Sequence, residues 1–482
     1  MRTMERRDFL SPGARIGGEW VVGDKRFAVK DPDEGAVIAE VADLGADAAL
    51  NAVAAASRAL PGWRRTAANE RARLTEAWAQ AITGASEDLA HLLTLEQGKR
   101  LEEARGEISQ CATMLRWFAE EARRTHGQTL PVNDGGVRNL TVKQPVGVVV
   151  AVTPWNFPAA AVVVKCGAAI AAGCTVVLKP SEFTPLIALA LVRLSVEAGL
   201  PAGVLNVVTC STPGAVGEVL ATDPRVHMVS FTGSTRVGKM LTAQAAGTLK
   251  KVALELGGNA PFIVFDDADL AQAADAAVGA RFYNSGQICI GANRFFVQDS
   301  VYDRFVEALG ARVAGLKLGT GLEPETRVGP LINEGAVSKV AALVDEAVAK
   351  GARAVTGGRR AARGGLFYEP TVLRDVTPEM GLYRAEIFGP VAPVYRFRSE
   401  EEVLARANET EAGLSAYVFT SKLGRLWRMA EELESGMVGA NTAMICAPEV
   451  PFGGIKQSGK GREGGLGSLD DYLEVKSICF GL

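Results

Sequence analysis

Histidine is scarce in this sequence, and the cysteines form no pairing motif. The chain of 482 residues contains three histidines, none of them in a glycine-rich turn: His91, His126 and His227. A serine or cysteine nucleophile that relies on a histidine base therefore has few candidate bases. The seven cysteines are scattered and include no Cys-x-x-Cys pair. This distribution argues against a disulfide framework and any structural zinc or other metal centre, and it favours a reducing, cytoplasmic compartment.

Strong net charge and long apolar segments are lacking as well. The formal net charge is −3, which predicts no surface for nucleic acid or for an anionic membrane. The longest apolar run, 159–172, is interrupted by Lys165 and Gly167 and is not typical of a membrane span. The opening segment "MRTMERRDFL" is charged and has no apolar stretch, so we expect no secretory signal.

Strand-like and helical segments alternate along most of the chain. A first series contains the apolar runs "VGVVVAVTP", "TVVLKP", "VLNVVT" and "HMVSFTG", each separated from the next by a helical segment. A second series runs from "APFIVF" through "FFVQ", "AVTGG" and "APVYRF" to "YVFT". Such alternation predicts an α/β protein with doubly wound parallel sheets. The chain is too long for one ordinary core, and we expect the boundary between the two units at "LELGGNAP", Leu254 to Pro261.

Three further segments lie outside these two series. Residues 46–124 have helical spacing, with a break near Gly84. The segments "LTVKQP" and "YLEVKSICF" are typical of strands, and we expect that they could pair across a subunit interface.

Two glycine-rich segments are candidates for a phosphate site. "GKGREG", Gly459 to Gly464, fits the dinucleotide pattern literally but follows no strand, so we interpret it as a loop with tight turns. "FTGSTRVG" has the required order of strand, turn and helix. Ser234 can cap that helix, and the exposed backbone N–H groups can bind a phosphate.

Cys289 lies within "NSGQICIGANR", between two isoleucines. A cysteine in such surroundings is more often a packed core residue. Gly286 and Gln287, however, allow a tight turn that would direct the thiol into a cleft and leave the Cys289 N–H free as an oxyanion donor. The candidate base is Glu255, at the end of an apolar stretch, where burial would raise the pKa of the carboxyl. By itself, Glu255 would more readily be interpreted as a solvated residue or a salt-bridge partner.

The motifs as a set resemble the aldehyde dehydrogenase superfamily. They occur in its order and at its spacings across essentially the whole chain: "TPWNFP", "GCTVVLKPSEFTP", "FTGSTRVG", "LELGGNAP", "NSGQICIGANR", "EIFGPV" and "PFGGIKQSGKGREGG". Within the superfamily the chain most resembles the succinate-semialdehyde dehydrogenase group, notably in "GCTVVLKPSE" and "YLEVKSICFGL".

The resemblance implies the domain organisation of that superfamily. A Rossmann-type NAD-binding domain is expected over residues 1–122 and 146–256, and an α/β catalytic domain over 257–454. A small β element for oligomerisation, over 123–145 and 455–482, would bridge subunits in a homodimer or homotetramer.

The resemblance also implies a mechanism and a set of site residues. Cys289 would attack the aldehyde carbon, Asn156 and the Cys289 N–H would hold the oxyanion, and Glu255 would activate water to release the acid. Lys165 and Glu463 match positions thought to move protons around the base, although a structural salt link would explain them as well. The implied cofactor residues are Trp155, Lys179, Ser181, Glu182, Gly233, Ser234, Gly238, Leu256, Glu386 and Phe388.

The cofactor expected from these residues is NAD in preference to NADP. The superfamily position three residues after the ribose-binding Lys179 holds Glu182 here. A carboxylate accepts hydrogen bonds from both ribose hydroxyls but repels a 2′-phosphate, at a cost on the order of 4 kcal/mol at ~4 Å and an effective dielectric of ~20.

The substrate positions depart from the succinate-semialdehyde group. Where that group holds its far carboxylate with two arginines and a serine, this chain has Val164, Tyr283 and about Ala447. We therefore expect either a succinate-semialdehyde-like substrate or, with Tyr283 packing against it, a less anionic aliphatic or aromatic aldehyde. Arg281 and Arg294 lie near enough in sequence to substitute, but Arg281 is expected to be a solvated helix residue.

Alternatives from other classes remain at this point. A nucleotide-independent cysteine hydrolase or acyltransferase would account for Cys289 and Glu255, but not for the strand-turn-helix unit or "EIFGPV". Coenzyme A-acylating relatives generally lack the glutamate at position 255. A non-catalytic structural member would be expected to lose one of these two residues.

Overall fold

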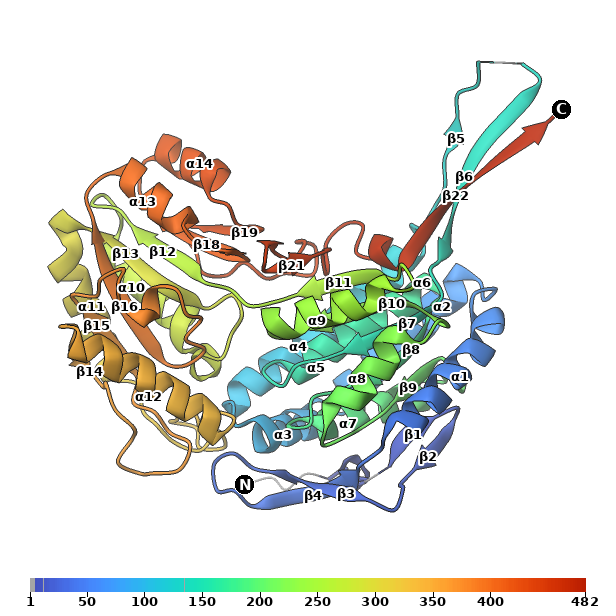
Figure 1. Ribbon diagram of the computed structural model, residues 1–482, viewed down its shortest axis with the longest axis horizontal. Coiled ribbons are helices and arrows are strands. Elements are labelled where there is room, and N and C mark those ends of the chain that lie inside the picture. The colour runs from blue at the N-terminus through green and yellow to red at the C-terminus, as the bar shows by residue number, and fades with distance from the viewer. Residues whose placement is uncertain (1–4, 12, 134) are drawn as a thin grey trace.

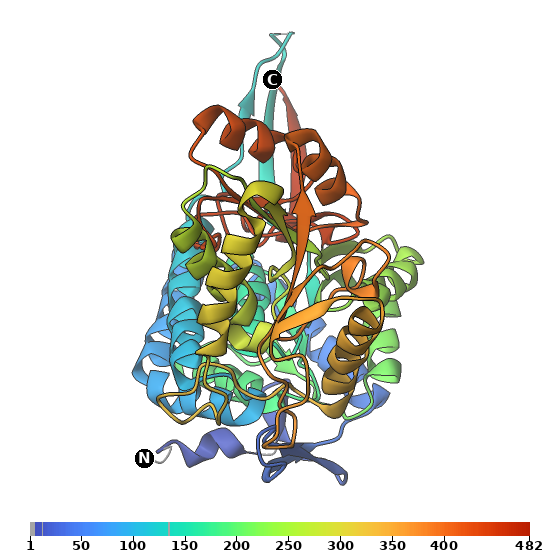
Figure 2. The same ribbon diagram turned by 90° about the vertical axis from the view of Figure 1, so that its left-hand side faces the viewer.

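The computed structural model describes residues 5–11, 13–133 and 135–482. It contains two α/β units side by side and a β arm that projects from one of them (Figures 1 and 2). Residues 1–4 and 12, within the first segment of the predicted nucleotide-binding domain, and residue 134, within the predicted bridging element, lie outside the described residues.

The first unit is built on an eight-stranded sheet of order β2-β1-β9-β8-β7-β10-β11-β21. Its five central strands are parallel, as the run of apolar segments predicts. The strands are β1 (Ala14–Ile16), β2 (Glu19–Val21), β7 (Val148–Val152), β8 (Thr175–Lys179), β9 (Leu205–Val207), β10 (Val226–Thr232), β11 (Lys251–Glu255) and β21 (Gly459–Lys460).

Helices cover both faces of this sheet because successive strand residues point to opposite sides. In β7, Val149 and Ala151 pack into the cluster formed by α2 to α7, whereas Val148 and Val150 pack into the cluster under α1 and α8. The helices are α1 (Ala46–Trp63), α2 (Ala68–Gly84), α3 (Ser86–Gln97), α4 (Leu101–Ala122), α5 (Pro158–Val162), α6 (Ala168–Ala172), α7 (Pro185–Glu197), α8 (Pro213–Thr222) and α9 (Thr235–Ala246). The predicted break near Gly84 separates α2 from α3.

The second unit has a seven-stranded sheet of order β14-β15-β16-β13-β12-β18-β19. Only β14 runs antiparallel to its neighbour. The strands are β12 (Ala260–Val264), β13 (Ala292–Gln298), β14 (Arg353–Thr356), β15 (Thr371–Arg374), β16 (Val391–Phe397), β18 (Ser415–Phe419) and β19 (Met437–Ala440). The helices are α10 (Leu270–Phe282), α11 (Tyr302–Ala314), α12 (Glu334–Ala349), α13 (Glu400–Asn408) and α14 (Leu423–Glu432). The α/β class and the doubly wound sheets predicted from the sequence are confirmed.

Residues 256–259 link the last parallel strand of the first sheet to β12 of the second. Near its C-terminal end the chain returns to the first sheet, where β21 pairs antiparallel with β11. "GKGREG" therefore begins at a two-residue edge strand and continues into turns, as the loop interpretation predicted. Two short pairs complete the fold: β3 (Arg26–Lys30) with β4 (Val37–Ala42), and β17 (Ala412–Gly413) with β20 (Ile455–Lys456).

The projecting arm is a three-stranded antiparallel sheet that carries the C-terminal strand. It consists of β5 (Thr129–Leu130), β6 (Val137–Pro145) and β22 (Leu473–Gly481). The two segments expected to be strands outside the main units thus pair with each other, from Leu473 opposite Pro145 to Gly481 opposite Val137. Among the described residues, no helix combines the length and the apolar character needed to cross a membrane.

Candidate active site

Several of the predicted site residues lie at the carboxyl ends of the parallel strands of the first sheet. Parallel strands end on the same side of a sheet, and that side is where α/β proteins place ligands. β7 leads into "TPWNFP", β8 ends at Lys179, β10 leads into Gly233, and β11 ends at Glu255. Cys289 reaches this region from the second unit, in the loop that precedes β13.

Cys289 and Glu255 lie close enough to share a hydrogen bond. Burial, and then the charge of Glu463, raise the pKa of Glu255 from 4.5 to about 8, while Lys165 and the Cys289 thiol act in the opposite direction. Burial and the Glu255 carboxylate together raise the pKa of the half-buried Cys289 well above 9.0. The expected rise in the pKa of Glu255 is therefore present, and the thiol at rest is protonated beside its candidate base.

One oxygen of Glu255 remains available. Oε1 is buried and has no hydrogen-bond partner among the described residues. A cavity of about 10 Å³ reaches Glu255 from the side of Phe452, Lys460 and Glu463, which is roughly the room that one water molecule needs. Glu255 thus has an unpaired buried acceptor among the described residues, and it is one of the residues that line a cavity of about the size of a water molecule.

Asn156 is buried where the loop after β7 meets the cysteine loop. Its Nδ2 donates to the Gln287 carbonyl over 3.1 Å, and its own carbonyl accepts from Asn284 Nδ2 over 2.9 Å. Asn284 and Ser285 have φ of 49° and 56°, and Gly286 has φ of 76°. The tight turn predicted at Gly286 is present, and it begins two residues earlier.

Lys165 lies in a π-helical turn, Val163–Gly167, between α5 and α6. Its fully buried side chain forms an ion pair with Glu463, with 2.6 Å between Nζ and Oε1, and its Nζ lies 3.4 Å from Ser230 Oγ. The structure thus contains the salt link. The link also sets the charge around the base, because Lys165 and Glu463 act in opposite directions on the pKa of Glu255.

The candidate phosphate segment has the predicted strand-turn-helix form. Ser234 caps α9 by accepting from the Val237 N–H over 3.4 Å. A Cβ added at Gly238 would lie 2.6 Å from Leu256 Cδ2, so a larger residue at this position would force the Leu256 side chain to shift. A Cβ at Gly233 would lie 2.5 Å from the ring of Phe231. The turn and the N-terminus of α9 that follows it fit a dinucleotide phosphate.

Residues from both units meet at the opposite end of the candidate cofactor site. Glu386 Oε1 accepts from the Gly258 N–H over 3.0 Å, and burial raises the pKa of this carboxyl. The rings of Trp155 and Phe388 meet edge to face, with 5.5 Å between their centroids. The contacts of Glu386 and Phe388 thus bring predicted residues of the second unit to the first unit and the linker. Within the first unit, Lys179 at the end of β8 and Ser181 just after it are buried, and Ser181 Oγ accepts from the Phe183 N–H.

The predicted substrate positions differ in their surroundings. Tyr283 lies parallel to Phe157, with 4° between the ring planes and 6.2 Å between centroids, and its hydroxyl donates to the Glu103 carbonyl over 3.5 Å. Val164 is half-buried in the π-helical turn, and Ala447 is half-buried in the loop 441–454. The neighbour of Ala447, Cys446, lies near enough for its charge to raise the pKa of Cys289.

The model of the aldehyde dehydrogenase family matches residues 20–478. The chain belongs to the aldehyde dehydrogenase family.

Several relatives of this dehydrogenase are similar over nearly their whole length. It is 50% identical over 471 residues to the succinate-semialdehyde dehydrogenase [NADP(+)] GabD of Escherichia coli (strain K12), covering 97% of this chain and 98% of the relative. It is 50% identical over 474 residues to the 3-sulfolactaldehyde dehydrogenase of Pseudomonas putida, covering 98% and 97%. A crystal structure described as an E. coli NADP dependent enzyme matches with a TM-score of 0.98 and 49% identity, covering 100% of both chains.

These relatives correct one expectation from the sequence. The preference for NAD over NADP is wrong, because the E. coli relative and the matching E. coli structure are both described as NADP-dependent. The expected repulsion of the 2′-phosphate requires an unscreened negative charge on Glu182. In the structure its Oε2 lies 3.9 Å from Lys179 Nζ, and its side chain is 30% exposed. The lysine offsets the repulsion, and the partly exposed carboxylate can turn toward solvent.

Arg281 also differs from the sequence-based expectation of a solvated residue. It is buried, donates to the carbonyls of Ala292 and Gly389, and has its pKa lowered to about 9 by burial. Arg294 is buried too and donates to three backbone carbonyls, those of Asn259, Arg406 and Ala407. Both guanidinium groups serve the packing of the second sheet, so neither replaces the missing arginines of the substrate site.

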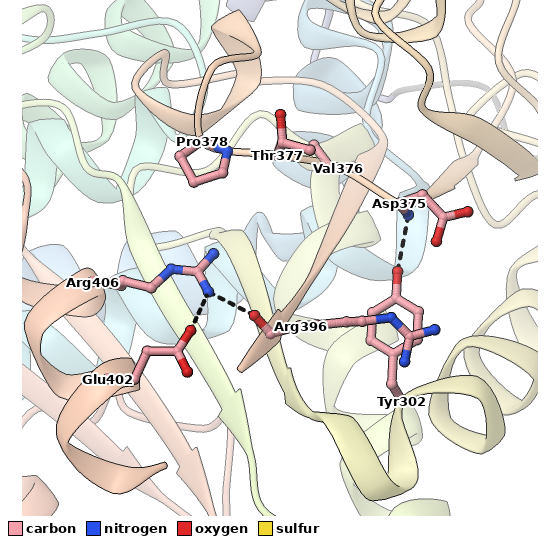
Figure 3. A pocket seen from close by; sticks show the side chains of 8 residues that line it. All are labelled: Tyr302, Asp375, Val376, Thr377, Pro378, Arg396, Glu402 and Arg406. Atoms are coloured by element: carbon pink, nitrogen blue, oxygen red, sulfur yellow. Dashed lines mark hydrogen bonds and ion pairs between the residues drawn. The ribbon is translucent and has the colours of Figure 1, made fainter. Parts of the chain in front are cut away.

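A cavity of about 500 Å³ on the second unit is separate from these residues (Figure 3). None of the predicted site residues is among the eight that line it. Arg396 stacks over Tyr302 at 3.7 Å from the ring centroid, and Arg406 pairs with Glu402 while donating to the Arg396 carbonyl. Because its two arginines are engaged, this cavity does not supply the missing cations.

Sequence reasoning missed the charged residues at the start of α4. Lys99, Glu103 and Glu107 are buried beneath the loops that carry Asn156 and Cys289. In the sequence these three residues stand among other charged residues in "GKRLEEARGE", a pattern that is typical of the solvated face of an ordinary helix.

Proposed function

We propose that this dehydrogenase oxidises an aldehyde to a carboxylic acid through a thioester on Cys289. The observation that carries the proposal is the contact between a protonated thiol and a buried carboxyl whose pKa is about 8. A carboxyl with such a pKa can accept a proton near neutral pH, which the ordinary carboxyl cannot do efficiently.

The chain's own groups supply the acid-base and electrostatic parts of the reaction. Glu255 takes the proton of Cys289, and the thiolate attacks the carbonyl carbon to form a thiohemiacetal. Asn156 Nδ2 and the Cys289 N–H stabilise the negative oxygen. Glu255 then releases the cysteine proton to solvent and is again available as a base. After oxidation to the thioester, Glu255 takes a proton from water in the adjoining cavity, the hydroxide attacks the thioester carbon, and the acid is released while the leaving thiolate recovers that proton from Glu255.

A nicotinamide dinucleotide, NADP included, is proposed as the cofactor that accepts the hydride. Support comes from the close packing of Gly238 against Leu256, from helix α9 with its cap at Ser234, and from the ion pair of Lys179 with Glu182. Lys179 would face the adenosine ribose and, in NADP, its phosphate. We propose that residues 1–122 and 146–256 form the cofactor domain and residues 257–454 the catalytic domain.

We propose an aldehyde with an uncharged far end as the substrate. The named substrates of the relatives, a succinate semialdehyde and a 3-sulfolactaldehyde, carry an anionic group. In this chain Arg281 and Arg294 are engaged, and Arg100 pairs with Glu102 and Glu103. A buried anion without a partner would cost ~3–5 kcal/mol. A neutral aliphatic or aromatic aldehyde packing on Tyr283 avoids this cost.

The experiment measures kcat/KM for succinic semialdehyde, butanal and benzaldehyde, each with NAD and with NADP. We expect reduced nicotinamide to form without coenzyme A, and the neutral aldehydes to be preferred. No oxidation of any aldehyde would refute the reaction. A preference of about a hundredfold or more for succinic semialdehyde would refute the neutral substrate class alone.

For the assembly we propose a homodimer or homotetramer in which the arm contacts a second subunit. The outer strand β22 leaves one edge unpaired, and Val475 and Phe480 on it are exposed. Light scattering after size-exclusion chromatography would give the mass, and a monomer would contradict the proposal.

A further inference from the structure

A buried ion pair lies directly beneath the candidate oxyanion site. Lys99 precedes α4 and Glu107 lies on it, with 2.5 Å between Nζ and Oε2. Their side chains are 0% and 1% exposed. Removing two charges from water costs more than their attraction usually returns, so a packed apolar pair would stabilise the fold at least as well. Stability therefore does not account for this pair.

The pair holds the Asn156 segment on both sides of that residue. Lys99 Nζ donates to the Asn156 carbonyl over 2.8 Å and lies 4.1 Å from the centroid of the Phe157 ring. Glu107 Oε1 accepts from the N–H groups of Ala159 and Ala160, over 3.0 and 3.1 Å, at the start of α5. The backbone is thus fixed before and after the point where the Asn156 side chain leaves it.

The same helix also holds the cysteine loop. Glu103 Oε1 accepts from the Asn284 N–H over 3.2 Å, and Asn284 Nδ2 donates to the Asn156 carbonyl. Asn156 Nδ2 in turn donates to the Gln287 carbonyl, two residues before Cys289. Glu103 and Glu107 of α4, together with Lys99 two residues before this helix, therefore hold the two segments that carry the proposed oxyanion donors, Asn156 Nδ2 and the Cys289 N–H.

We propose that Lys99 and Glu107 are positioning residues that fix the Asn156 amide relative to Cys289. This inference rests on the proposed function and deepens it. Oxyanion donors act only when they lie about 2.7–3.1 Å from the developing charge. A displacement of ~1 Å in such a site can cost ~100-fold in rate. Lys99 touches no reacting atom, so its effect on the rate passes through Asn156.

The first test replaces Lys99 with methionine, Lys99→Met, in the full-length protein. Loss of the donor to the Asn156 carbonyl is expected to lower kcat/KM for the aldehyde about 100-fold. The Kd for NADP, measured by calorimetry, is expected to remain unchanged, whereas general damage to the fold would weaken both. An unchanged kcat/KM would overturn the proposal.

A double-mutant cycle with Asn156→Ala separates positioning from a structural role. Asn156→Ala alone is expected to cost ~100–1,000-fold. If Lys99 acts through Asn156, Lys99→Met should have no further effect on kcat/KM in the Asn156→Ala background. Effects that multiply would show that the pair acts independently of Asn156, and the proposal would be wrong.

Two further variants keep the test valid if a single unpaired charge prevents folding. Lys99→Met combined with Glu107→Gln leaves no buried charge unpaired, and it is expected to show the same loss as Lys99→Met; full activity would overturn the proposal. Glu96→Gln is the matched control. Glu96 is a buried carboxyl that accepts from the N–H groups of Leu186 and Ile187 at the start of α7, as Glu107 does at α5. Its loss should leave kcat/KM near that of the unmutated protein.

A nucleotide-free readout distinguishes failure of this inference from failure of the proposed function. Cys289 can attack p-nitrophenyl acetate, which forms an acetyl thioester and releases p-nitrophenolate through the same oxyanion donors. If Lys99→Met slows the release of p-nitrophenolate, but causes no further slowing when Asn156 is already replaced by alanine, the positioning role is supported. This result would hold even if no aldehyde is oxidised. An unchanged release in Lys99→Met overturns the positioning role whatever the aldehyde assay gives.

Discussion

Raising the pH from 7 to 9 should increase the turnover of this dehydrogenase about tenfold. Glu255 must be ionised to accept a proton, and its pKa is about 8. Because this pKa is raised, the active charged form is about a tenth of the protein at pH 7, about half at pH 8 and about nine tenths at pH 9. The pKa of Cys289 lies well above 9.0, so ionisation of the free thiol does not set this midpoint.

The assay is the steady-state kcat for butanal or benzaldehyde, neither of which titrates, at saturating cofactor and constant ionic strength between pH 6.5 and 9.5. Glu255→Gln should lower kcat by ~100–10,000-fold and abolish the rise with pH. Glu463→Gln is a second variant for the same assay. The charge of Glu463 raises the pKa of Glu255, so its removal should move the midpoint of the rise of kcat with pH below 8 while activity remains. A midpoint that persists in Glu255→Gln, or moves upward in Glu463→Gln, would refute the assignment of the base.

Three further predictions follow from the same geometry. Cys289→Ala should abolish aldehyde oxidation while calorimetry shows unchanged NADP binding; residual turnover near normal would exclude the thioester route. Glu255→Gln should be more stable than the unmutated protein at pH 9 but not at pH 4. Because the carboxyl pKa is raised on folding, the free energy of unfolding of the unmutated protein falls as the pH rises from 4.5 to 8, by about 5 kcal/mol at most. Chemical denaturation at the two pH values tests the sign of this difference. Tyr283→Arg should raise kcat/KM for succinic semialdehyde ~10–100-fold relative to butanal by supplying a carboxylate partner, and an unchanged ratio would place the far end of the substrate elsewhere.

The parts of the fold that the sequence predicts are those with a strong local pattern. β7 and β8 are continuous apolar, β-branched segments, and they form central parallel strands as that pattern indicates. The helical segment expected between these two strands is not a regular α-helix throughout, because its middle, Val163–Gly167, is a π-helical turn. A Cβ at Gly167 would lie 2.7 Å from Leu115 Cδ2 on α4, so this turn lies in close contact with a distant helix. Local spacing contains no information about that contact.

The candidate site also combines features that the sequence reveals with features that it does not. Cys289 and Glu255 are predicted from the whole set of motifs, because each residue by itself fits an ordinary packed or solvated position. Lys99 contacts the Asn156 carbonyl from 57 positions away, and a lysine beside an amphipathic helix is ordinarily solvated. Arg281 was misjudged for this reason, because its burial depends on the packing of α10 against carbonyls of other segments. The screening of Glu182 by Lys179 likewise depends on side-chain geometry after β8.

The pairing of Cys289 with Glu255 would also affect how readily the proposed nucleophile is oxidised or alkylated. Peroxides and alkylating agents attack the thiolate far faster than the thiol. A resting pKa well above 9.0 keeps Cys289 in the less vulnerable form until its proton is drawn off by Glu255. If Cys289 acts as proposed, the arrangement that limits the ionised base near neutral pH would also protect the thiol from oxidation between turnovers. A variant engineered for a more acidic thiol would then react faster but be inactivated sooner.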